Sequence, residues 1–63
     1  MFRVALVDKL GEHKSENFNK REEVDEFILS NEATKFMIAE NGVIIETNKG
    51  VRWKNYQLVY QWH

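Results

Sequence analysis

The side chains that could support hydrolytic catalysis are few and scattered along the chain. A hydrolytic triad needs Ser, His and a carboxylate converging on one rigid site. The candidates are Ser15, Ser30, His13 and His63. Only His13 and Ser15 share a segment, and that segment is polar. We therefore interpret all four as solvated side chains and expect no nucleophilic catalysis.

Metal binding and phosphate binding have equally little support. A metal site needs three or four ligands at a fixed geometry. The chain has no cysteine, and Glu12, His13 and His63 would meet only by accident of the fold. The three glycines, Gly11, Gly42 and Gly50, are scattered and form no phosphate-binding loop. We expect no metal and no cofactor.

A group of acids gives the strongest clustering of titratable residues, at Glu22, Glu23, Asp25 and Glu26. Glu22 and Glu26 would share one face of a helix. Catalytic acid pairs, however, need a cleft that shifts their pKa values, and an exposed first helical turn supplies none. We interpret the acids as a solvated face that complements the helix dipole, and we expect the protein not to be an enzyme.

Basic and aromatic residues alternate near the C-terminal end, at Lys49, Arg52, Trp53, Lys54, Tyr56, Tyr60 and Trp62. Such a pattern can bind single-stranded nucleic acid, with charges on phosphates and rings under bases. The net charge of −1 argues against it. Aromatic residues also favour strands and fill small cores. Nucleic-acid binding through Lys49, Arg52, Trp53 and Lys54 is therefore the alternative, and a core or subunit interface is preferred.

Length and composition limit the architecture that could position these residues. The chain has 63 residues, of which 43% are hydrophobic and 30% charged, so we expect one globular domain over residues 1–63. The absence of cysteine favours a reducing, cytoplasmic location. The longest apolar run, residues 4–7, is too short to span a membrane.

Two regular elements are expected in the first half of the chain. Residues 1–10 are rich in β-formers, with Phe2, Val4 and Leu6 on one face and Ala5 and Val7 on the other, which indicates an inner strand. Residues 11–17 are polar and are interpreted as a loop. A helix then follows, with Asn19 as N-cap and Glu22 completing a capping box. Its buried stripe would be Val24, Phe27 and Ile28.

A hairpin is predicted around Asn41-Gly42, because a two-residue turn of this sequence accepts positive φ at both positions. The expected register places Glu40 opposite Val43, Ile38 opposite Ile45, and Phe36 opposite Thr47. The face toward the helix would then carry Phe36, Ile38, Val43 and Ile45. The opposite face would carry Met37, Ala39, Ile44 and Glu46.

The final strand, residues 51–62, follows a second turn at 48–50, and its alternation is inconsistent. Val51 and Trp53 are odd-numbered, whereas Leu58, Tyr60 and Trp62 are even-numbered. Either a bulge near Asn55 returns all five side chains to the core, or the strand is regular and its second half faces the other way. These alternatives stay open at this point.

The expected fold is α+β with two layers, in which one helix packs on a mostly antiparallel sheet of about four strands in the order β-α-β-β-β. The single helix would leave an apolar sheet face open, and such a face usually marks an interaction site. We therefore expect a small adaptor or regulatory protein of bacterial or phage type that forms a homodimer or binds a larger protein. The candidate interface residues are Met37, Ile44, Tyr56, Leu58, Tyr60 and Trp62.

Overall fold

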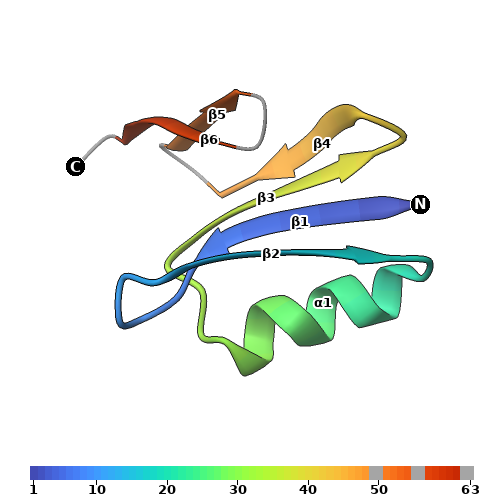
Figure 1. Cartoon of the computed structure of the whole chain (residues 1–63), viewed down its shortest axis with the longest axis horizontal. Coiled ribbons are helices and arrows are strands. Elements are labelled where there is room, and N and C mark those ends of the chain that lie inside the picture. Colours follow the sequence, from blue (N-terminus) through green and yellow to red (C-terminus); the bar gives the residue numbers. More distant parts are fainter. Residues whose placement is uncertain (49–50, 55–56, 62–63) are drawn as a thin grey trace.

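The computed structural model describes residues 1–48, 51–54 and 57–61. Its elements are β1 (Phe2–Val7), β2 (His13–Phe18), α1 (Arg21–Ser30), β3 (Lys35–Glu40), β4 (Val43–Thr47), β5 (Val51–Lys54) and β6 (Gln57–Gln61). Strands β1 to β4 form an antiparallel sheet in the order β2-β1-β3-β4. Helix α1 packs on one face of this sheet (Figure 1). The predicted two-layer α+β class is confirmed.

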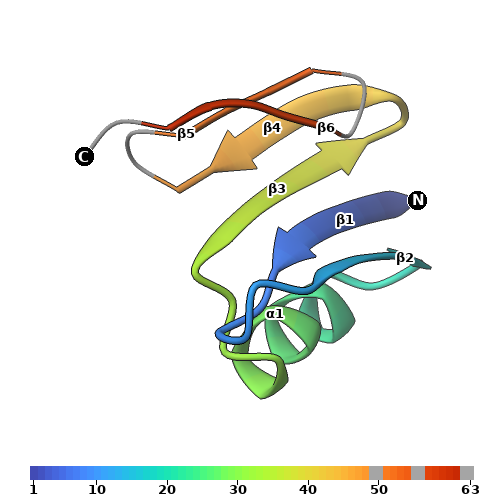
Figure 2. The same ribbon diagram turned by 60° about the vertical axis from the view of Figure 1, so that its left-hand side comes forward.

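Strands β5 and β6 pair with each other in a separate two-stranded sheet. This hairpin lies on the side of the four-stranded sheet away from α1 (Figures 1 and 2). The expectation of one final strand over residues 51–62, whether bulged or regular, is wrong. The chain instead reverses direction between Lys54 and Gln57, so the two halves have unrelated phases.

Strand β1 is the inner strand that its two apolar faces predict. It pairs with β2 on one side and β3 on the other. Val4 and Leu6 pack with Val24 and Ile38 beneath the helix. Ala5 and Val7 face the opposite side of the sheet, where the hairpin lies.

Strand β2 corrects the interpretation of residues 11–17 as a loop. It pairs with β1 along its whole length, from Phe2 opposite Phe18 to Val7 opposite His13. Because β2 lies at the sheet edge, polar and charged side chains can point to solvent on it without cost. The sequence of β2 therefore lacks the apolar alternation by which strands are recognised.

Helix α1 has the predicted buried stripe but not the predicted cap. Val24 is fully buried, and Phe27 and Ile28 pack around it. The N-cap residue is Lys20, in extended conformation, and its side chain forms no capping hydrogen bond. The predicted capping box from Asn19 to Glu22 is therefore wrong.

The β3–β4 hairpin has the predicted turn and a different register. Asn41 and Gly42 both have positive φ, at 51° and 86°. Glu40 pairs with Val43 and Ala39 with Ile44, but Ile38 pairs with Glu46 and Met37 with Thr47. Ile45 is thus an extra residue at a β-bulge, and the predicted pairs Ile38–Ile45 and Phe36–Thr47 do not form.

The bulge moves side chains of β4 from their predicted faces. Glu46 lies on the helix side of the sheet, where its carboxylate is 3.2 Å from the guanidinium of Arg21. Val43 and Ile45, predicted to be core residues, are exposed. Phe36 and Ile38 do face the helix, and Met37 and Ala39 face the other side, as predicted.

Candidate interaction surfaces

The sheet face opposite α1 is covered rather than open. Trp53 of β5, only 7% exposed, packs there with Ala5, Val7, Met37 and Ala39, and Met37 is completely buried. The indole Nε1 of Trp53 is also buried, and no described residue accepts a hydrogen bond from it. Met37, a predicted interface residue, is therefore part of a second small core.

The other predicted interface and nucleic-acid residues fall into three groups. Ile44 lies on β4 and is 37% exposed. Lys49, Tyr56 and Trp62, and the side chains of Arg52, Lys54, Leu58 and Tyr60, lie outside what the structure describes. Trp53, the ring expected to stack under a base in the nucleic-acid alternative, is turned into the core and presents no free face.

The outer edge of β4 is the most apolar exposed feature of the described chain. Val43, Ile44 and Ile45 are consecutive, and they are 64%, 37% and 48% exposed. Strand β4 ends the four-stranded sheet, and no ladder joins it to β5 or to any other described strand on its outer side. We call Val43–Ile45 and the adjoining backbone the β4 edge. An exposed apolar edge strand is a template for pairing with another chain.

The opposite edge of the sheet has the contrary character. Strand β2 carries the sequence HKSENF, in which charged and polar groups predominate. Lys14 Nζ donates a hydrogen bond to Asn31 Oδ1 at 2.8 Å and lies 3.4 Å from Asp8 Oδ2. Charged side chains of this kind discourage an apolar edge strand from pairing with β2.

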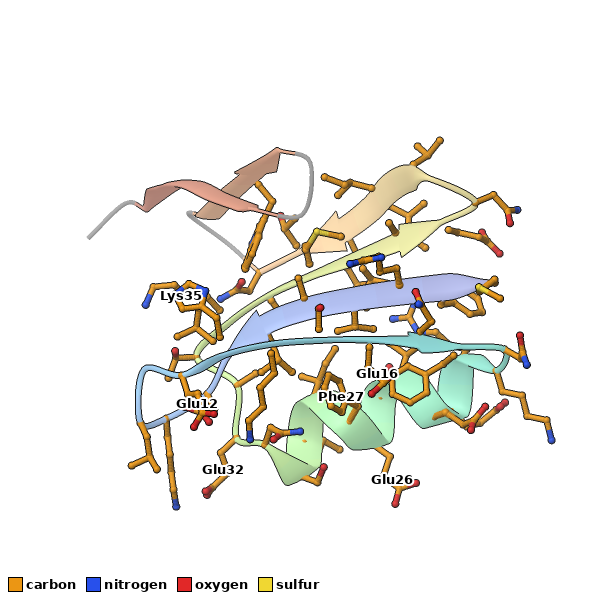
Figure 3. The ribbon with its side chains drawn as sticks, viewed as in Figure 1. Glu12, Glu16, Glu26, Phe27, Glu32 and Lys35 are labelled. Carbon is orange, nitrogen blue, oxygen red and sulfur yellow. The ribbon has the colours of Figure 1, made fainter. Side chains whose placement is uncertain are left out.

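A groove of about 250 Å³ lies between the end of β2 and α1, lined by Phe18, Glu23, Glu26, Phe27 and Ser30. The four helical residues are spaced i, i+3, i+4 and i+7, which places them on one face. The rings of Phe18 and Phe27 have centroids 5.3 Å apart and are tilted by 55°. In Figure 3, Glu16 projects from β2 toward the helix near Phe27, and Glu26 extends away from the sheet.

The carboxylates of this groove are free among the described residues. Glu23 and Glu26 form no described ion pair, whereas Asp25 of the same helix and Glu46 of β4 both pair with Arg21. The acids were recognisable in the sequence, but they were interpreted only as a solvated face of the helix. Phe18 was the overlooked residue. It directly follows residues 11–17, which were interpreted as a loop, and it is the one apolar side chain of β2.

Asp8 is a buried carboxylate that no sequence motif indicated. Its Oδ1 accepts hydrogen bonds from the backbone N–H groups of Leu10 and Glu12, both at 2.9 Å. The hydrogen bond from Glu12, aided by Leu10 and Lys14, lowers the pKa of Asp8 against the opposing effect of burial. This carboxylate is ionised and holds the turn between β1 and β2 in place.

The part of the chain that the structure describes contains no group of three or more His, Cys, Asp or Glu arranged to hold a metal ion. In the same ranges, no helix has the length and apolar character needed to cross a membrane. A scan against protein-family models, a search of curated proteins and a search of solved structures each find no match.

Proposed function

We propose that this chain is a small protein-interaction module that self-associates by pairing the β4 edges of two copies. The observation that carries this proposal is the run of three exposed β-branched residues, Val43, Ile44 and Ile45, on a sheet edge with no described partner. The sequence alone favoured the open sheet face for this role. The burial of Met37 beneath Trp53 directs the proposal to the edge instead.

A second copy suits the β4 edge because antiparallel pairing of two identical strands is self-complementary. A two-fold axis near Ile45 would place the apolar residues of each strand against those of the other, as an isologous interface requires. Glu46 is held by Arg21 on the helix side, so its charge has a partner within its own copy. Backbone hydrogen bonds and buried Ile and Val side chains would both contribute to the association.

The polar β2 edge supports a closed dimer over an open assembly. If both edges were apolar, β4 of one copy could pair with β2 of the next, and such head-to-tail contacts would propagate. Lys14 and Glu16 make β2 a poor match for the apolar β4 edge. Because the two edges differ, two copies are expected to pair through β4 and no further copy is expected to add through β2.

The test is the solution mass of the protein measured by light scattering from micromolar to millimolar concentration. We expect a dimer that persists at high salt, because apolar burial is not screened by ions. Ile45→Lys should give a monomer, since a charge on the edge opposes strand pairing. Ser15→Lys, which adds the same charge to the β2 edge, is the matched control and should remain a dimer. A monomeric wild-type protein at millimolar concentration would refute the proposal.

A further inference from the structure

We propose that the groove between β2 and α1 binds an extended basic segment of a partner protein, with a Lys or Arg side chain lying in the groove. Two features of the structure meet there. The groove has an aromatic floor at Phe18 and Phe27 and acidic walls at Glu23 and Glu26. It also adjoins the outer side of β2, which ends the sheet and has no described strand beyond it.

The outer side of β2 provides the backbone groups for such a segment. A peptide can add as a further strand to a free sheet edge, with main-chain hydrogen bonds giving affinity and pockets for alternate side chains giving specificity. The pairing of β1 with β2 places Lys14, Glu16 and Phe18 on the helix side of the sheet, opposite Leu6, Val4 and Phe2. Every second side chain of an added strand would face that same side, above the groove.

The groove itself selects a long side chain with a cationic head. Lys and Arg can lay their methylene stems on apolar surface while the charged head stays at its rim. Here the stem would cross the Phe18 and Phe27 rings, whose faces also attract a cation. The head would reach the carboxylates of Glu23 and Glu26, which have no described ion-pair partner to displace.

The charge of α1 supports a basic partner over a neutral or acidic one. The helix carries four carboxylates against a single guanidinium, that of Arg21, and its last turn has no basic residue. Clustered charge of one sign raises the rate of encounter with a ligand of the opposite sign. Arg21 is already engaged by Asp25 and Glu46, so it leaves the groove acids available.

The test adds a short capped peptide of alternating Val and Lys to isotope-labelled protein and monitors amide chemical-shift changes. We expect saturable shifts along residues 14–18 and 23–30, and a dissociation constant that rises with salt. Glu23→Gln combined with Glu26→Gln should weaken binding about tenfold, as expected for losing two solvent-exposed ion pairs. The control variant combines Glu12→Gln with Glu22→Gln. It removes the same two negative charges as the groove variant, but outside the groove, and it should bind the peptide like the wild type.

Two further probes separate strand addition from general charge attraction. The same peptide with alternate backbone nitrogens methylated cannot form a ladder and should bind more weakly. A Val and Glu peptide should not bind. Equal losses in the groove and control variants, or no binding of the Val and Lys peptide at millimolar concentration, would overturn the proposal. The Ile45→Lys variant should still bind the peptide, so peptide binding can be tested independently of self-association through the β4 edge.

Discussion

The guanidinium Nη2 of Arg21 lies 3.2 Å from Oε1 of Glu46, and this pair joins the first turn of α1 to strand β4. The two residues are 25 positions apart, and they meet because the bulge at Ile45 brings Glu46 to the helix side of the sheet. The interaction with Glu46, together with Asp25, raises the pKa of Arg21, so the guanidinium stays charged at every accessible pH.

Removing this pair should cost little stability. Both side chains are exposed, so Glu46→Gln is expected to lower the free energy of unfolding by about 0–1 kcal/mol, and by less at high salt. Urea denaturation at low and high salt measures the difference. A loss that is large and independent of salt would mean that the pair is buried and that β4 is not an exposed edge.

Asp8 should make stability depend on pH at the acid end. Its folded pKa lies below the ordinary value of 3.8, so the unfolded chain takes up a proton first as pH falls. The stability that Asp8 contributes is therefore present above about pH 3.8 and is lost as the pH falls through the lowered folded pKa. Asp8→Asn should flatten this part of a denaturation profile between neutral and acid pH. An unchanged acid slope would contradict the hydrogen-bonding role.

The indole N–H of Trp53, which is buried and has no hydrogen-bond partner among the described residues, should be a cost to the fold. Trp53→Phe keeps an aromatic ring against Met37 and removes a buried donor, whose burial without a partner costs about 1–3 kcal/mol. We expect this variant to be close to the wild type in stability or more stable. Trp53→Ala should instead lose about 3–5 kcal/mol through the cavity it leaves. Equal losses in the two variants would show that the N–H has a partner.

The turn at Gly42 should resist any side chain for backbone reasons alone. Its φ is 86°, and a Cβ added there would meet no atom within 4 Å. Gly42→Ala is therefore expected to cost about 1–2 kcal/mol, the penalty of a left-handed conformation for an L-residue. Thermal or urea unfolding tests this value. No loss of stability would show that the chain does not hold a positive φ at Gly42.

The fold class and several elements could be predicted because local patterns match their final environment. The two apolar faces of β1, the stripe Val24-Phe27-Ile28 and the Asn41-Gly42 turn each have a short-range cause. Strand β2 could not be predicted in this way, because an edge strand with polar side chains resembles a loop. The bulge at Ile45 was also hidden, since three consecutive β-branched residues suit a regular strand and a bulged one equally.

The location of the candidate interaction surfaces could not be predicted from local sequence patterns, because it depends on long-range tertiary contacts. The phase conflict between Trp53 and Leu58 was visible in the sequence, but its cause is a reversal of the chain between β5 and β6. No local pattern indicates that Trp53 then covers Met37. That long-range contact buries the face predicted to associate, whereas the consecutive residues Val43, Ile44 and Ile45 of β4 are exposed.

The most direct test of β4–β4 pairing is isotope-filtered NMR on an equal mixture of ¹³C-labelled and unlabelled protein at a concentration where the dimer dominates. We predict intermolecular NOEs between the methyl groups of Val43, Ile44 and Ile45 in one copy and β4 protons of the other. They should vanish in Ile45→Lys and remain in Ser15→Lys. Intermolecular NOEs confined to α1 or β2, or none in a sample of dimeric mass, would contradict association through the β4 edge.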